Sequence, residues 1–281
     1  MKDLLNSFYN INILQYKEYN NGIIFQIDGI NFYLVECEYT EEYLHYLESL
    51  IVRYSNLKLH SFVYNKYNKI LSSGFILLKL NIMIEDISLY DLNKLKNITI
   101  DKINNDYLTM DQFWENKIDY LEKQLAEISS NKLINNSFDY FLGIAEILIS
   151  YFKRNFNKNN LILSVSHRSL YSLSTIDFYN PLNICFDYYL KDYIAYIRLT
   201  NNYDLLYELI SNIKNKNDYT YLFVRMTFPF KYFYEVENIL IDGVHEHDLV
   251  KIVNEIKDYE MYLAKIEKVF RIYVFSWIKK E

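Results

Sequence analysis

Cysteine, glycine and proline are scarce in this chain of 281 residues, which contains two Cys, five Gly and two Pro. Two cysteines exclude the disulfide framework of a small secreted domain and are typical of a reducing compartment. Phosphate-binding loops need glycines close together, so few such loops can exist here. The sequence also lacks a Walker loop and the Gly-x-Ser-x-Gly elbow of hydrolases.

Basic charge and long apolar runs are lacking as well. The 30 Lys and Arg residues are outnumbered by 36 Asp and Glu residues, which argues against a nucleic-acid partner. The N-terminal segment contains Asp3 and has no signal-peptide pattern. The most apolar stretch, 138–152, contains two acidic residues and is shorter than the ~20 residues needed to cross a bilayer. We therefore expect a soluble cytoplasmic protein without a membrane partner.

Apolar and aromatic residues are abundant. Hydrophobic residues make up 51% of the chain, including 30 Tyr and 18 Phe, which is ample material for a core. Because Tyr, Asn, Ile, Lys and Phe are enriched together, an AT-rich genome explains this composition. The aromatics are spread along the whole chain and not interleaved with basic residues, so a base-stacking surface is not favoured.

The first 80 residues or so alternate like strands and hairpins. Two apolar runs flank Asp28-Gly29, a pair typical of hairpin turns. Thr40 precedes acidic residues suited to a first helical turn, and helical spacing continues to about Tyr54. The expected strands cover residues 22–27, 32–35, 59–64 and 74–80.

After about Asn81 the pattern is mostly helical. A short apolar run at 161–165 suits a buried strand, and Gly143 inside an apolar helix predicts a close contact between helices. The order predicts an α+β protein with a strand-rich lobe, 1–80, followed by a helical lobe, 81–281. The expected helices cover 110–128, 139–153, 192–199, 203–213, 232–240 and a long C-terminal stripe from Leu249 to Trp277.

A family resemblance rests on four segments of the second half. They are 137–152 (SFDYFLGIAEILISYF), 165–168 (VSHR), Phe186-Asp187 followed by 191–197 (KDYIAYI), and 225–237 (RMTFPFKYFYEVE). Their order and spacing resemble the spore-coat kinase-like proteins of endospore-forming bacteria (CotS/YutH type), members of the aminoglycoside-phosphotransferase and protein-kinase-like superfamily. The resemblance covers roughly residues 20–240. It implies a two-lobed protein-kinase-like fold, with a small antiparallel-sheet N-lobe that includes one helix and a larger helical C-lobe.

The catalytic segment departs from the pattern that the resemblance implies. In the phosphotransferase branch this segment reads His-Gly-Asp, with an Asn five residues after the Asp. The matching residues here are His167-Arg168-Ser169 and Ser174. A serine hydroxyl has no carboxylate to accept the substrate proton and is a poor Mg²⁺ ligand. Both positions are therefore degenerate, and His167 is expected to be a structural hydrogen-bonding residue.

Two acidic residues are candidates for the nucleotide-bound metal. Asp187 follows His167 by 20 residues, about where the resemblance implies the metal-binding Asp. Asp177 is ten residues nearer and stays an alternative. Asp192 resembles the Asp that opens the next helix in the family, and we interpret it as an N-cap.

The strand-rich lobe also departs from the family. Its phosphate-covering segment, 16–22 (YKEYNNG), has one glycine. Glu36 replaces the lysine expected on the third strand, followed by Cys37, and a glutamate there would repel a triphosphate. Without that lysine, the helix acids Glu41, Glu42 and Glu48 have no functional partner and are interpreted as a solvated face.

The segment 244–248 has the composition of a metal site, but we predict no metal site there. His245 and His247 in 244–248 (VHEHD) lack a third ligand.

We therefore predict a pseudokinase that acts as a binding or scaffold module, in the cytoplasm or spore coat. Its expected partner is an unknown protein, such as a component of coat assembly, and no cofactor is expected. One alternative is an active small-molecule phosphotransferase with relocated residues, which would use ATP and Mg²⁺. The other is a structural protein whose cleft is filled by its own aromatic side chains.

Overall fold

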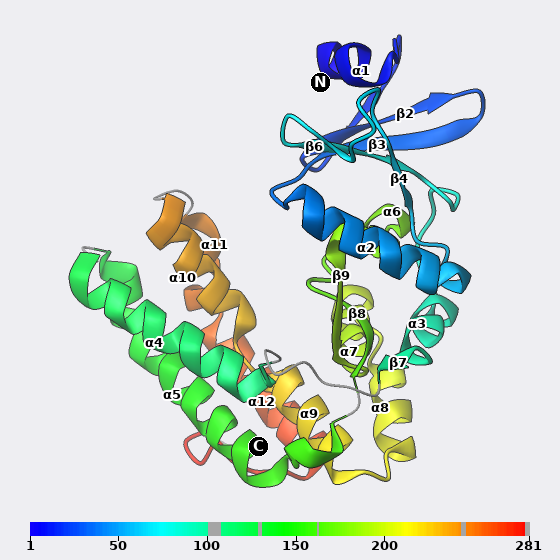
Figure 1. The fold of residues 1–281 in the computed structure, drawn as a ribbon. Coiled ribbons are helices and arrows are strands. Elements are labelled where there is room, and N and C mark those ends of the chain that lie inside the picture. Colours follow the sequence, from blue (N-terminus) through cyan, green and yellow to red (C-terminus); the bar gives the residue numbers. More distant parts are fainter. Residues whose placement is uncertain (101–107, 129–130, 162, 243–245, 279–281) are drawn as a thin grey trace. The chain divides into compact units, whose positions relative to one another are not determined.

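The computed structural model describes residues 1–100, 108–128, 131–161, 163–242 and 246–278. These residues pack as two compact units (Figure 1). The first comprises Met1–Ile100 and Leu163–Leu199, and the second comprises Asp101–Ile162 and Thr200–Glu281. The boundary near residue 80 stays a prediction. Within the described part of the chain, no helix has both the length and the apolar character needed to cross a membrane.

The first unit is built on an antiparallel sheet with strand order β1-β2-β3-β6-β4, and β5 pairs with β6. The predicted hairpin is confirmed: Asp28 and Gly29 form its turn with φ of 50° and 79°. Helix α2 (Glu41–Arg53) begins as predicted, because the Thr40 side chain accepts a hydrogen bond from the Tyr43 N–H. The strands are β1 (Lys17–Tyr19), β2 (Gly22–Ile27), β3 (Ile30–Glu36), β4 (Ser61–Val63), β5 (Leu71–Ser72) and β6 (Phe75–Lys79).

Helices pack against both faces of this sheet. Tyr33, Val35 and Cys37 pack with Leu44 of α2 on one face. The opposite face packs against α1 (Lys2–Tyr9) through the fully buried Leu5. The sequence pattern predicts no helix at this end of the chain. An isolated helix of eight residues is unstable in water, so α1 depends on this packing, which the local sequence does not reveal.

A second, three-stranded antiparallel sheet in the same unit has the order β7-β8-β9. The strand predicted at 161–165 is β8, displaced toward the C-terminus. Helix α7 begins at Lys191, so the interpretation of Asp192 as an N-cap is wrong. These elements are α3 (Leu89–Lys96), β7 (Thr99–Ile100), β8 (Leu163–His167), α6 (Thr175–Phe178), β9 (Ile184–Tyr188) and α7 (Lys191–Thr200).

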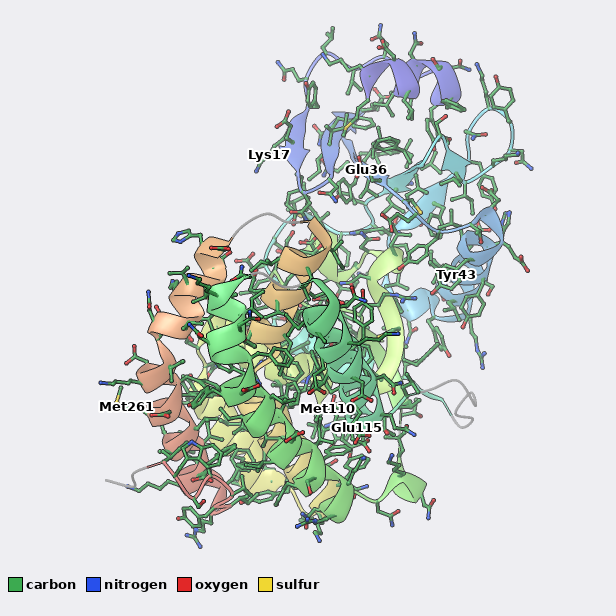
Figure 2. All side chains as sticks on the ribbon, turned by 90° about the vertical axis from the view of Figure 1, so that its left-hand side faces the viewer. Lys17, Glu36, Tyr43, Met110, Glu115 and Met261 are labelled. Atoms are coloured by element: carbon green, nitrogen blue, oxygen red, sulfur yellow. The ribbon has the colours of Figure 1, made fainter. Side chains whose placement is uncertain are left out.

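The second unit is helical, with an aromatic core in which Trp114 contacts Phe228 and Phe230. Figure 2 marks α4 by Met110 and Glu115, and α12 by Met261. The predicted single C-terminal helix is wrong, because it divides at Glu255 and ends at Phe270. Helix α9 was not predicted. The helices are α4 (Met110–Ile128), α5 (Lys132–Asn155), α8 (Tyr203–Asn212), α9 (Lys216–Thr227), α10 (Phe230–Asp242), α11 (Glu246–Asn254) and α12 (Ile256–Phe270).

Two glycines should respond oppositely to alanine. At Gly22 an added Cβ would lie 2.1 Å from the Leu34 carbonyl oxygen, so Gly22→Ala should cost about 1–3 kcal/mol through backbone displacement. At Gly143 a Cβ would meet nothing within 4 Å, which contradicts the predicted close helix contact. Gly143→Ala should instead gain up to about 1 kcal/mol of helix stability. Urea unfolding of both variants tests this, and equal signs would contradict it.

Candidate functional site

The β1–β2 turn of the first unit meets the residues that follow β8 at a single carboxylate, Asp177 on α6. Its Oδ2 accepts hydrogen bonds from the Tyr19 hydroxyl at 2.7 Å and the Ser172 hydroxyl at 2.5 Å. Its Oδ1 accepts from Asn20 Nδ2 and the Tyr171 hydroxyl, both at 3.2 Å. Asp177 is only 3% exposed. A contact across 158 residues therefore fixes the turn to this segment.

The tyrosine hydroxyls around Asp177 are held in their protonated form. Burial raises the pKa of Tyr19, and the nearby Asp177 carboxylate raises it further. Burial and then Asp177 raise the pKa of Tyr171 to about 12. Tyr33 lies beneath Tyr19, with ring centroids 5.7 Å apart. The hydroxyls consequently remain hydrogen-bond donors to the carboxylate at neutral pH.

His167 at the end of β8 is completely buried in a network with Asp192 of α7. Asp192 accepts from the His167 backbone N–H at 3.3 Å, and its Oδ2 lies 2.8 Å from His167 Nδ1. His167 Nε2 lies 2.7 Å from the Phe178 carbonyl oxygen, to which it must donate. Asp192 thus orients the histidine and does not cap its helix.

Ser169 and Ser174, the two positions predicted to be degenerate, lie at different places in this unit. Ser169 is exposed, and its backbone is held by Asn183, which accepts from the Ser169 N–H at 3.1 Å and donates to its carbonyl at 2.8 Å. Ser174 accepts a hydrogen bond from the Ile176 N–H and so caps α6. Both serines therefore have structural contacts that involve backbone groups.

Arg168, between His167 and Ser169, extends to α2. It donates a hydrogen bond to the Tyr43 hydroxyl at 2.5 Å, and its guanidinium lies 5.5 Å from the centroid of the Tyr39 ring. Tyr43 is labelled on α2 in Figure 2. The Arg168 side chain therefore contacts two tyrosines, Tyr39 and Tyr43.

Asp187, the tentative Mg²⁺ and nucleotide ligand, lies on β9. Its Oδ2 is 2.6 Å from Lys191 Nζ, an ion pair that joins β9 to the first residue of α7. Cys185 is nearby, and burial raises the pKa of its thiol to about 12, so it remains protonated. The structure places Asp187 in this ion pair and Asp177 against the β1–β2 turn.

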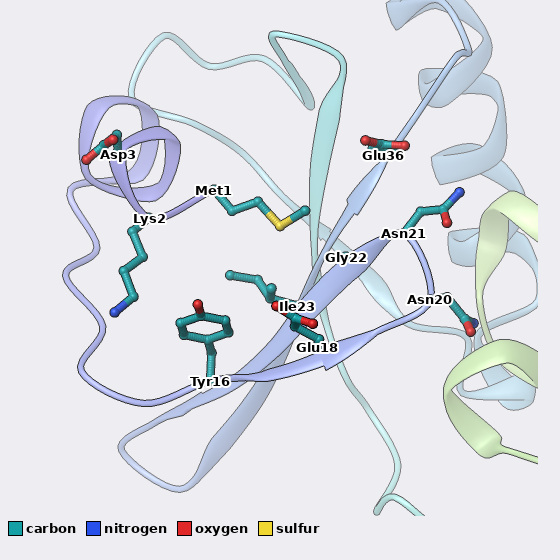
Figure 3. Close-up of a pocket in the computed structure, with 10 residues that line it drawn as sticks. All are labelled: Met1, Lys2, Asp3, Tyr16, Glu18, Asn20, Asn21, Gly22, Ile23 and Glu36. Atoms are coloured by element: carbon teal, nitrogen blue, oxygen red, sulfur yellow. The ribbon is translucent and has the colours of Figure 1, made fainter.

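Glu36 lies on the sheet face that carries α1. Figure 3 shows it with Lys2, Glu18 and Gly22 around a cavity of about 540 Å³. The carboxylates of Asp3, Glu18 and Glu36 outnumber the ammonium group of Lys2 in its lining, and this excess of negative charge disfavours a triphosphate. The neighbouring positions Val35 and Cys37 face α2 instead. That Glu36 replaces the lysine expected on the third strand stays a prediction. Of these two neighbouring residues, Cys37 is the one that faces α2.

The predicted solvated acids of α2 have defined partners in two of three cases. Glu41 accepts from the backbone N–H groups of Ile70 and Leu71 at 2.7 and 2.8 Å. Glu48 accepts from the Tyr64 hydroxyl at 2.6 Å. Glu41 is therefore more than a solvated acid, whereas the Glu48 hydrogen bond lies on the exposed surface. Glu41 thereby joins α2 to the start of β5. Without it, the backbone N–H groups of Ile70 and Leu71 would lack these acceptors.

No metal cluster of three or more His, Cys, Asp or Glu side chains occurs among the residues that the structure describes. Val244 and His245 of the segment 244–248 lie outside the described residues, and His247 is exposed on α11.

Comparison with known proteins identifies the fold. No protein-family model and no curated protein matches this chain. An aminoglycoside phosphotransferase from Alicyclobacillus acidocaldarius is similar in structure, with a TM-score of 0.64, 12% identity and 95% of each chain covered. The spectinomycin phosphotransferase APH(9)-Ia, in complex with ADP and spectinomycin, has a TM-score of 0.53 and 10% identity over 96% of each chain. The predicted α+β kinase-like fold is confirmed; such low identity shows the fold alone.

Sequence reasoning gave less weight to Asp177 than its contacts justify. The residue count from His167 favoured Asp187, because the family spacing assumes a segment of fixed length after the catalytic motif. The buried Ile176 and Phe178 on either side of Asp177 were a usable signal. A carboxylate that is buried beside such core residues must find hydrogen-bond donors.

Proposed function

We propose that this protein is a pseudokinase, a kinase-like binding module without ordinary phosphotransferase activity. The observation that carries the proposal is Ser169, an exposed hydroxyl where the family resemblance implies the catalytic carboxylate. Removing a catalytic group of this kind costs several orders of magnitude in rate in related systems. Asp187 supports the same conclusion, because its carboxylate is paired with Lys191.

The partner of such a module would be another protein. The resemblance to spore-coat kinase-like proteins favours a component of the coat or of sporulation, in the cytoplasm or the coat itself. A scaffold role requires a folded surface and no turnover, which is consistent with a kinase-like fold whose catalytic positions are serines. No bound cofactor is part of this proposal.

An active phosphotransferase is the second candidate, because the similar solved structures are phosphotransferases. It would bind ATP with Mg²⁺ through an acidic residue of this unit, and Asp177 and Asp187 are the residues in question.

Nucleotide binding and turnover separate the two candidates. We expect purified protein to show no thermal shift with ATP and Mg²⁺, and no ATP hydrolysis above a buffer blank. Asp187→Ala should leave both results unchanged, because its carboxylate is paired with Lys191. A thermal shift that Asp187→Ala or Asp177→Ala abolishes, together with turnover, would establish the active enzyme instead.

A further inference from the structure

We propose that Asp177 is a latch that holds the β1–β2 turn closed on residues 171–177 without nucleotide or metal. The inference deepens the proposed pseudokinase function and rests on it, because a carboxylate engaged in this way is not available to a catalytic metal. The latch consists of Asp177 and its four donors, Tyr19, Asn20, Tyr171 and Ser172.

The acceptor capacity of Asp177 is fully used. An ionised carboxylate accepts about four hydrogen bonds through its two oxygens. Two donors reach Oδ1 and two reach Oδ2, at distances from 2.5 to 3.2 Å. All four are uncharged side chains of this chain. Several hydrogen bonds to the charged form stabilise a buried carboxylate without a cation.

The turn itself is shaped for this contact. Asn20 has φ of 45°, a left-handed conformation that asparagine tolerates better than most residues. Gly22 lets the backbone approach the Leu34 carbonyl more closely than a Cβ would permit. The backbone of the turn is therefore fixed by residues 20 and 22, while the side chains of Tyr19 and Asn20 reach Asp177.

The aromatic ring beneath the latch completes it. The Tyr19 ring packs edge-on against Tyr33, which is 2% exposed. The Tyr33 hydroxyl donates to the Tyr19 carbonyl at 3.5 Å. Tyr19 therefore makes three contacts: its ring packs on Tyr33, its carbonyl accepts from the Tyr33 hydroxyl, and its own hydroxyl donates to Asp177. A shift of the turn would break these contacts together.

Mg²⁺ does not fit at Asp177 in this arrangement. Mg²⁺ requires near-octahedral oxygen coordination, and the carboxylate would have to release donors on one or both oxygens. The latch therefore keeps the β1–β2 turn closed on residues 171–177 without a ligand. This part of the first unit presents one conformation to a partner protein whatever the nucleotide concentration.

Amide hydrogen exchange on the full chain tests the latch. Tyr19→Phe with Asn20→Gly removes two donors and keeps the ring and the positive φ. In this double variant, amides of residues 17–24 should exchange about tenfold faster than in the wild type. The matched control is Tyr16→Phe, which removes the hydroxyl of an exposed tyrosine just before β1. It should leave exchange unchanged. If the double variant does not fold, Asn20→Gly alone should still accelerate exchange about twofold.

Two outcomes would overturn the latch. One is exchange in residues 17–24 of the double variant no faster than in the Tyr16→Phe control. The other is protection of these amides in the wild type by Mg²⁺–ATP that Asp177→Asn abolishes, since the carboxylate would then serve a metal. ATP turnover with no change in this exchange would refute the proposed function and leave the latch in place, so the two failures are distinguishable.

Discussion

Asp192→Ala should lower the free energy of unfolding by roughly 3–5 kcal/mol, because it leaves buried hydrogen-bonding groups of His167 without their acceptor. Asp192 is 5% exposed and His167 is completely buried. The carboxylate accepts from the His167 backbone N–H and faces Nδ1, while Nε2 is already committed to Phe178. His167 has therefore no alternative orientation that satisfies both ring nitrogens.

The matched control is Asp204→Ala. Asp204 is exposed in the first turn of α8, so its loss reports only the interaction with the helix dipole, about 0.3–1 kcal/mol. Asp192→Asn keeps one acceptor oxygen and should fall between the two. Urea unfolding followed by circular dichroism measures all three. A loss at Asp192→Ala no greater than at Asp204→Ala would show that the buried pair does not hold this segment.

Acid should destabilise the protein through His60, and His60→Gln should remove that part of the pH dependence. His60 is 1% exposed, and burial lowers its pKa from 6.5 to about 4. Its Nδ1 accepts from the Asn81 N–H at 3.3 Å, so the remaining hydrogen lies on Nε2. The folded protein therefore keeps a neutral imidazole that the unfolded chain can protonate.

The direction of the effect follows from proton binding. Between pH 6.5 and about 4 the unfolded chain binds a proton at His60 that the folded protein does not, so stability falls as the pH falls. The gap between these pKa values corresponds to about 3 kcal/mol in total. Above pH 6.5 and below pH 4 this contribution should be constant.

A pH series of urea unfolding curves isolates the contribution. Carboxylates titrate in every variant, so the difference between wild type and His60→Gln reports His60. His45→Gln is the control for the substitution itself, because the His45 side chain is 50% exposed. If His60→Gln and the wild type lose stability in parallel from pH 6.5 to 4, the imidazole of His60 is not the acid-sensitive group.

Local features of the fold could be predicted because neighbouring residues determine them. The turn at Asp28-Gly29 needs only two residues that tolerate positive φ, and both adopt it. Thr40 caps α2 through a residue three positions away. The bounds 110–128 of α4 follow from one apolar stripe. These signals lie within a few residues of each other, so no knowledge of the remote chain is needed.

Other features depend on packing. Helix α1 has too few residues to be stable alone, and Leu5 holds it on the sheet. The C-terminal apolar stripe continues across Glu255, where the chain nevertheless starts a new helix. Periodicity alone could not reveal these features, because it records which residues are apolar and not which surface covers them.

The sequence by itself determined that serine, and therefore no carboxylate, occupies positions 169 and 174. Only the tertiary structure decided which acidic residue meets the β1–β2 turn and which side of β3 faces α2. Successive residues of an extended segment point to opposite faces. The side on which α2 packs therefore decides that Cys37, and not Glu36, faces that helix. Asp177 meets Tyr19 because the fold brings together residues 158 positions apart, a distance over which no local pattern carries information.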